Sequence, residues 1–114
     1  MAKVKINVFL EKNGHIIFDR DVNAIMLDNK IRYLDDVLNV FDISNLILKR
    51  SSSNYSIELD FVNQSGVYIS SFVRVPICIN VLYKSVCNNC FHIKYEQEMF
   101  DERNVFIYIL KVIL

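Results

Sequence analysis

The feature that most constrains the fold is a period-two alternation of apolar and polar residues that recurs along the chain. In residues 4–10 every second side chain is aliphatic, and Tyr55–Phe61 and Phe91–Tyr95 repeat the pattern with aromatic residues included. Successive side chains of a strand point to opposite faces, so each of these stretches predicts a strand with one buried face.

Two further stretches carry the same signal over a greater length. The first follows Gly14, where the side chains expected on one face are Ile16, Phe18, Val22, Ala24 and Met26. The second is centred on residues 77–83, where the corresponding side chains are Ile77, Ile79, Val81 and Tyr83. Pro76 cannot donate a hydrogen bond to a neighbouring strand, so it predicts an edge, a bulge or a bend at that point.

Turn-forming pairs separate several of these stretches. Asn13-Gly14, Asp28-Asn29 and Asn88-Asn89 consist of residues that tolerate the positive φ values of tight hairpin turns. About eight or nine short strands joined by such turns predict an all-β chain, folded as a closed antiparallel barrel or a sandwich.

The segment 34–45 fits two periodicities. Its apolar residues at 34, 37, 38 and 41 follow the spacing of a short helix, whereas residues 37–41 fit a strand about as well. We expect a strand, because Asp42–Asn45 is turn-like and Leu46–Arg50 resumes the character of a strand. A helix in this segment would change the fold class to α+β.

Size and charge exclude several classes of protein. A chain of 114 residues with 53% hydrophobic residues predicts one domain spanning residues 1–114. Its 13 basic and 13 acidic residues are dispersed, which predicts no nucleic-acid partner. The longest apolar run, Val105–Leu110, is far shorter than the roughly 20 residues of a membrane span. Three cysteines without an export signal predict reduced thiols and a cytoplasmic protein.

Three segments carry a family resemblance: Leu46–Arg50, Ile57–Phe61 and Phe91–Glu96, in this order and spacing. From about Lys3 to Val112 the chain resembles the YwiB-like family of Firmicutes, which are small proteins of unknown function. The resemblance implies an antiparallel up-and-down, calycin-like (lipocalin-like) β-barrel of about eight to nine strands. The chain differs from the family at Ser52, where a glycine is common, and in its paired cysteines.

The segment Cys87–His92 is the candidate metal site. Cys87, Cys90 and His92 could supply two or three ligands to zinc, but a structural site needs four and no second paired motif is present. We therefore interpret the segment as a hairpin turn at Asn88-Asn89 with a cysteine on each side, and we predict no metal and no other cofactor.

Polar residues on the predicted inward faces form the candidate ligand site. They are Arg20, Arg50, Tyr55, Tyr83, Tyr95 and Gln97. A buried arginine is costly unless it is paired, so these residues suggest a small acidic or amphipathic ligand in the mouth of the barrel. The alternative is a filled interior, with a bulge turning Arg20 outward, Arg50 at a strand end in water and the tyrosines capping the core.

No catalytic signature is present, so we do not expect an enzyme. The pair Asp35-Asp36 is interpreted as a solvated turn, and the chain contains neither a phosphate-binding glycine loop nor a serine-hydrolase motif. The alternative function is that of a protein-interaction or inhibitor module, binding a partner or a second copy through a sheet edge or apolar patch. The candidate patch residues, which lie off the predicted buried faces, are Phe9, Phe72, Phe106, Tyr108 and Leu110.

Overall fold

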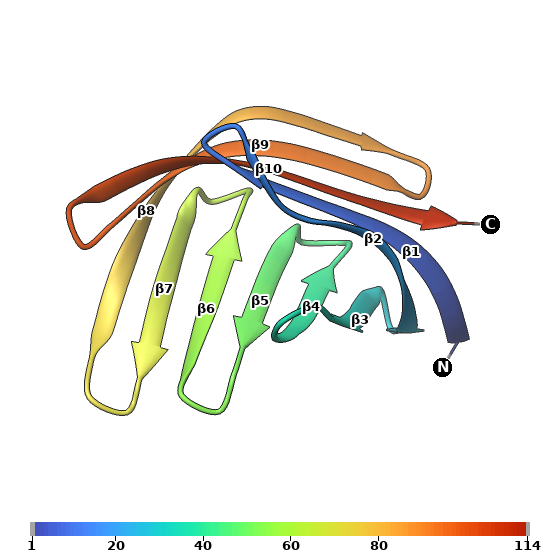
Figure 1. Ribbon diagram of the computed structural model, residues 1–114, viewed down its shortest axis with the longest axis horizontal. Coiled ribbons are helices and arrows are strands. Elements are labelled where there is room, and N and C mark those ends of the chain that lie inside the picture. Colours follow the sequence, from blue (N-terminus) through green and yellow to red (C-terminus); the bar gives the residue numbers. More distant parts are fainter. Residues whose placement is uncertain (1, 114) are drawn as a thin grey trace.

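The computed structural model describes residues 2–113 and consists of ten antiparallel strands joined by short turns. The strands are β1 (Ala2–Lys12), β2 (His15–Leu27), β3 (Lys30–Leu34), β4 (Leu38–Asp42), β5 (Ile47–Ser51), β6 (Tyr55–Asp60), β7 (Ser65–Ser70), β8 (Arg74–Cys87), β9 (Cys90–Met99) and β10 (Glu102–Ile113). Each strand pairs with the next, and β1 also pairs with β10, which closes an up-and-down barrel (Figure 1). The predicted all-β barrel is confirmed, with ten strands in place of eight or nine.

The strands fall into two groups by length. The short strands β3 to β7 lie side by side on one wall, and the longer β1, β2, β8, β9 and β10 arch across the other (Figure 1). Strand β8 connects the two walls, because Arg74–Cys78 pairs with β7 and Cys78–Cys87 pairs with β9. Pro76 lies in the first of these parts, where β7 is the only strand partner among residues 2–113, so the predicted edge position is confirmed.

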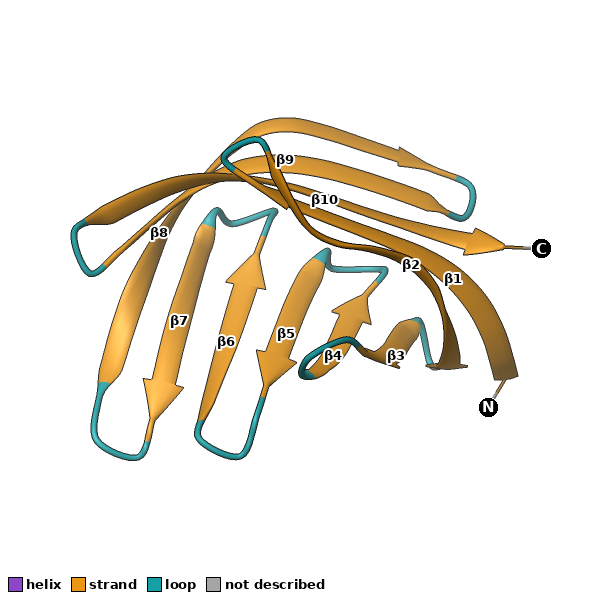
Figure 2. Ribbon diagram, in the orientation of Figure 1, coloured by secondary structure: helices purple, strands orange, loops and turns teal. Residues whose placement is uncertain are grey.

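Segment 34–45 contains no helix, and Leu38–Asp42 forms β4 (Figure 2). The carboxylate of Asp42 organises the turn that follows, since its Oδ1 accepts hydrogen bonds from the backbone N–H groups of Ser44 and Asn45, both at 3.0 Å. Asp60 does the same for the β6–β7 turn. Partial desolvation raises the pKa of both carboxyls. Hydrogen bonds from these backbone groups and from the side-chain amides of Asn45 and Asn63 outweigh it, so the pKa of each carboxyl is lowered.

Side chains from both walls form a dry core at the centre of the barrel. We use this name for Ile6, Ile31, Phe41, Leu48, Phe91, Ile93 and Leu110, all of which are at most 4% exposed. Phe41 lies at its centre, with its ring centroid 5.1 Å from that of Phe91. The inward faces predicted for β1 and β9 are confirmed by this packing.

None of residues 2–113 belongs to a helix long and apolar enough to cross a membrane.

Two bulges correct the predicted faces of β2 and β8. In β2, Leu10 pairs with Phe18 and Glu11 pairs with Ile16, so Ile17 is an extra residue and Ile16 turns outward. In β8, the extra residue is Leu82, and Tyr83 turns outward by the same mechanism. The predicted inward positions of Ile16 and Tyr83 are therefore wrong: they are 61% and 51% exposed.

The apolar patch considered for a protein partner does not form. Tyr108 and Leu110 are buried, because the β1–β10 register aligns them with the inward-facing Leu10 and Val8. Phe9 and Phe106 are half-buried. Of that set only Phe72 is fully exposed, at 95%, in the turn between β7 and β8.

Candidate ligand-binding site

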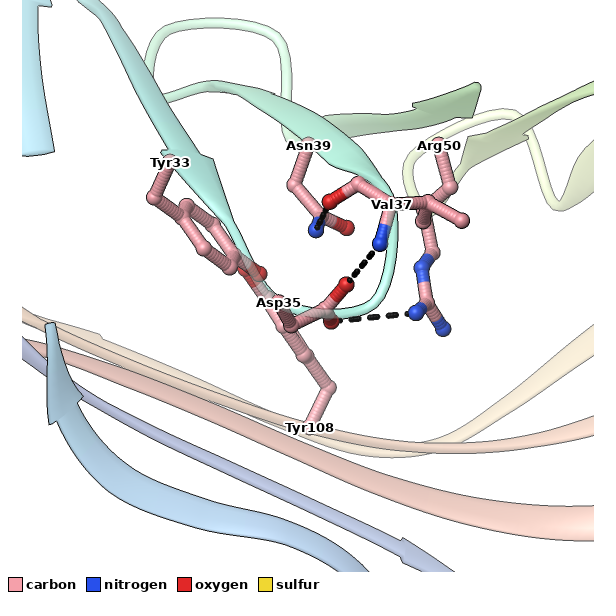
Figure 3. Close-up of polar contacts among 6 residues, drawn as sticks. All are labelled: Tyr33, Asp35, Val37, Asn39, Arg50 and Tyr108. Carbon is pink, nitrogen blue, oxygen red and sulfur yellow. Dashed lines mark hydrogen bonds and ion pairs between the residues drawn. The ribbon is translucent and has the colours of Figure 1, made fainter. Parts of the chain in front are cut away.

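Beside the dry core, the inward side chains of four strands become polar. The change occurs within one two-residue step, for example from Ile31 to Tyr33 on β3 and from Leu48 to Arg50 on β5. Side chains two residues apart share a face, so these polar groups point into the barrel. We call the group the interior polar cluster (Figure 3); its members are Tyr33, Asp35, Asn39, Arg50 and Tyr108.

An ion pair joins β5 to the turn between β3 and β4 within the interior polar cluster. Arg50 Nη2 lies 3.0 Å from Asp35 Oδ2, and the side chains are 26% and 5% exposed, respectively. Asp35 Oδ1 also accepts a hydrogen bond from the backbone N–H of Val37 at 2.9 Å. The prediction of a solvated turn at Asp35 is therefore wrong, because its carboxylate neutralises an inward-facing arginine.

The tyrosines of the interior polar cluster are neutral. The hydroxyls of Tyr33 and Tyr108 lie 2.8 Å apart in a hydrogen bond, and both side chains are buried. Burial raises the pKa of both, and it also raises the pKa of the neighbouring Tyr95. The only charges in the cluster are thus those of Asp35 and Arg50, which cancel.

Two polar atoms of the interior polar cluster have no hydrogen-bond partner within residues 2–113. Asn39 is 1% exposed and donates through Nδ2 to the carbonyl of Val37 at 3.0 Å, but its Oδ1 is unpartnered. Arg50 Nε is also buried without a partner. Reversing the Asn39 amide would set its oxygen against the Val37 carbonyl, so the hydrogen bond fixes the orientation. Buried unpartnered groups are rare in native proteins and call for an explanation.

A cavity of about 80 Å³ is lined by Asn39 and Arg50, the two residues that carry the unpartnered atoms. Because water occupies about 30 Å³ per molecule in the liquid, this space holds two or three waters or one molecule of about four heavy atoms. Its remaining walls come from both sides of the barrel and are mostly apolar: Val8, Leu10, Leu48, Ile57, Leu59, Tyr95, Gln97 and Phe106. The arrangement offers one free donor, one free acceptor and apolar walls.

Half of the predicted ligand-site residues meet at this cavity. Arg50, Tyr95 and Gln97 all line it. Arg20 does not: it is exposed, and its guanidinium lies 4.6 Å from the ring centroid of Phe18. Arg20 thus lies in solvent, as in the alternative, but no bulge turns it outward: the Ile17 bulge precedes Phe18, and Arg20 pairs with the inward-facing Val8.

The other two predicted residues lie elsewhere. Tyr83 is on the outer surface against His92, with ring centroids 5.0 Å apart. Tyr55 stacks on Tyr68 at 5.8 Å, and neither lines the cavity. Tyr83 was misplaced because of the Leu82 bulge, which the sequence does not announce.

The sequence prediction missed four members of the site, Tyr33, Asp35, Asn39 and Tyr108. A signal for three of them was present. The alternation that starts at Ile31 continues through Tyr33 to Asp35, and Asn39 alternates with Phe41 in the same way. Asp35 was interpreted as part of a solvated turn, although this period assigned it to the interior.

The segment Cys87–His92 forms the turn that was predicted for it. Cys87 and Cys90 pair across the hairpin and Asn89 has a φ of 64°, so the turn is confirmed. The thiols of Cys78, Cys87 and Cys90 are not bonded to each other. Within residues 2–113, no group of three His, Cys, Asp or Glu side chains is placed to hold a metal ion.

Together, the fold and the site define a ten-stranded up-and-down barrel whose partly polar interior contains a cavity of about 80 Å³. In comparisons with known proteins, no protein-family model, no curated protein and no solved structure matches this chain. The assignment of a function therefore rests on the geometry of the interior polar cluster.

Proposed function

We propose that the protein binds one small polar molecule at the interior polar cluster, as a non-enzymatic binding barrel. The observation that carries this proposal is the pair of unpartnered atoms, Asn39 Oδ1 and Arg50 Nε, beside a cavity of about 80 Å³. A ligand with a hydrogen-bond donor next to an acceptor would satisfy both atoms at once. Barrels of about this size commonly hold one small ligand.

The charges of the site favour a neutral ligand. Asp35 already neutralises Arg50 at 3.0 Å, and the raised pKa values of Tyr33 and Tyr108 keep both hydroxyls uncharged. A carboxylate ligand would add an uncompensated charge in a largely desolvated space, which is costly. Of the acidic and amphipathic ligands suggested by the sequence, the site favours a small neutral amphipathic one, such as a primary amide or an alcohol. Its alkyl part would contact Ile57 and Phe106.

The relation to a protein family and the cellular location are part of the same proposal. We propose that the barrel is calycin-like and related to the YwiB-like family, in keeping with the all-β, up-and-down order of its strands. A cytoplasmic location is supported by the unbonded thiols of Cys87 and Cys90, which lie opposite each other across a hairpin.

A charge series of small probes tests the proposal. We expect saturation-transfer NMR at pH 7 to detect acetamide on the protein, with much weaker signals from acetate and ethylammonium. A ligand of four heavy atoms is limited to roughly tens of micromolar at best, and millimolar affinity is the realistic range, so a ligand-observed method is required.

Two matched variants test whether the acetamide signal comes from the interior polar cluster. Asn39→Leu should abolish the acetamide signal, because it removes the free acceptor and fills part of the cavity. Asn80→Leu is the control, since Asn80 is exposed on β8. If wild type does not bind acetamide, or if Asn39→Leu binds it equally well, the proposed function is wrong.

A further inference from the structure

The wall of the barrel has an opening between β2 and β3. Strand β2 pairs with β1 along most of its length, but it pairs with β3 only through Ile25–Leu27. Within the described residues, His15–Ala24 has no strand on its other side. Strand β3 likewise leaves β2 after Arg32, so Tyr33 and Leu34 are unpaired on that side. Backbone groups on both strand edges are therefore free to pair with an added chain.

A groove of about 1180 Å³ occupies this opening. Its apolar lining comes mainly from Val4, Val22, Ala24, Ile25, Leu34 and Leu38. Its charged lining comprises the cations Lys3, Lys5 and Arg32 and a single anion, Asp21. None of the three cations forms an ion pair within residues 2–113, and Asp21 accepts a hydrogen bond from Asn7 at 2.9 Å. The groove thus presents an excess of positive charge over an apolar floor.

The cations of the groove lie on the outward face of the wall, together with part of its apolar lining. Lys5 on β1 pairs with Asn23, and Arg32 on β3 pairs with the outward-facing Ile25. Val22 and Ala24 share the inward face of β2 with the buried Phe18. A strand placed against β2 would therefore meet Val22 and Ala24 with one set of alternate side chains. Its other set would lie on the outward face, beside Asp21 and Asn23, with the cations on the neighbouring strands.

We propose that this opening accepts an extended peptide in which acidic and apolar residues alternate, added as a strand against residues 21–24 of β2. The free backbone edge supplies the hydrogen bonds of strand addition. The apolar residues of the peptide would contact Val22 and Ala24, and its acidic residues would lie on the face that carries Lys3, Lys5 and Arg32. Charge complementarity selects an acidic partner, because Lys3, Lys5 and Arg32 outnumber Asp21. The proposal is independent of ligand binding at the interior polar cluster.

Other free edges of the barrel are protected, which singles out this opening. The first half of β2 carries the Ile17 bulge and an arginine, Arg20, paired with the inward-facing Val8. The free edge of β8 carries the Leu82 bulge and Lys84, and Gln64 Oε1 accepts a hydrogen bond from the N–H of Val81 at 2.9 Å. Bulges and inward-pointing charges are the devices by which proteins prevent strand addition. Residues 21–24 have neither device.

Fluorescence anisotropy with a labelled seven-residue peptide of alternating glutamate and valine tests the proposal. The peptide should bind, and its affinity should fall with added salt. The same peptide with lysine in place of glutamate should bind at least tenfold more weakly. Lys3→Glu/Lys5→Glu should weaken binding of the glutamate peptide at least tenfold, whereas Lys94→Glu, at an exposed site on β9, should leave it within twofold.

N-methylated peptides separate strand addition from simple charge attraction. Two versions, methylated on the backbone at every valine or at every glutamate, each remove the N–H donors along one edge of the peptide. At least one version should lose binding tenfold or more. Undiminished binding of both versions, or no binding of the parent peptide, would overturn the proposal. Binding of dodecanoate in the groove without binding of the peptide would also overturn it, in favour of a single-chain amphiphile.

Discussion

The dry core and the interior polar cluster lie side by side on the same strands, yet they differ in every chemical respect. Phe41 in the dry core and Asn39 in the cluster are two residues apart on β4, and both are at most 1% exposed. Phe41 packs against Phe91, whereas Asn39 keeps an unpartnered oxygen beside a cavity. The alternation of a strand decides which side chains face inward, but it does not decide their polarity.

Stability alone does not account for the polar half. A buried ion pair is often no more stabilising than apolar residues of similar volume, and an unpartnered buried polar atom is destabilising. Asp35, Asn39 and Arg50 combine both features around one cavity. Proteins retain such costs where a site needs them, so the contrast between the two regions supports a binding role for the cluster.

The largest effect is expected in the dry core. Phe41→Ala should lower the free energy of unfolding by about 3–5 kcal/mol, the usual loss for a buried phenylalanine, because it leaves a cavity between Phe91 and Tyr108. Urea unfolding measures this directly. A loss below about 1 kcal/mol would mean that the core is not packed as described.

The next effect comes from breaking the ion pair. Asp35→Ala should cost about 2 kcal/mol, less than the 3–5 kcal/mol of a fully buried pair, because Arg50 is 26% exposed and retains contact with water. Asp35→Asn is the control, since its side-chain oxygen can still accept the hydrogen bond from Val37 and its cost should be smaller. Equal stability of wild type and Asp35→Ala would contradict the pairing.

A smaller effect is expected from the tyrosine pair. Tyr33→Phe leaves the buried hydroxyl of Tyr108 without its partner at 2.8 Å, which should cost about 1 kcal/mol in urea unfolding. Tyr83→Phe, at an exposed position, should change the free energy of unfolding by less than about 0.5 kcal/mol. Should the two substitutions cost the same, the buried hydrogen bond would carry no net stability.

The smallest effect is expected in the ionisation of the buried tyrosines at high pH. Burial raises the pKa of Tyr33, Tyr95 and Tyr108 in the folded state above the value of about 10 in the unfolded chain. The free energy of unfolding therefore keeps its full value below pH about 10 and falls as the pH rises further, because the unfolded chain ionises first. Tyr95→Phe should leave the tyrosinate absorbance of the native protein unchanged between pH 10 and 11. In unfolded protein the same substitution should remove one tyrosinate, and an equal loss in the native protein would refute the burial.

Much of the fold follows from local sequence signals. The alternation of residues 4–10 and the turns at Asn13-Gly14 and Asn88-Asn89 predicted strands and hairpins that the structure contains. The bulges at Ile17 and Leu82 could not be predicted, because a bulge depends on the register against a partner strand. That is why the positions of Ile16 and Tyr83 were wrong.

The site was harder to predict than the fold. Arg50, Tyr95 and Gln97 were found because they lie on strands with an unbroken inward face. Asp35 lies just after β3, and its carboxylate turns inward to meet Arg50, a contact between residues that belong to different hairpins. Such a pairing depends on the register of β4 against β5, in which Asn39 lies opposite Arg50, and no local sequence signal specifies that register.

Under the proposed function, the interior polar cluster serves binding rather than stability. The most direct test is the free energy of unfolding of the triple variant Asp35→Asn/Asn39→Leu/Arg50→Met, which removes the charges and the unpartnered atoms but keeps the acceptor for Val37. We predict that urea unfolding finds this variant within about 1 kcal/mol of wild type or more stable. A loss of more than about 2 kcal/mol would contradict the claim and make the cluster a structural element of the barrel.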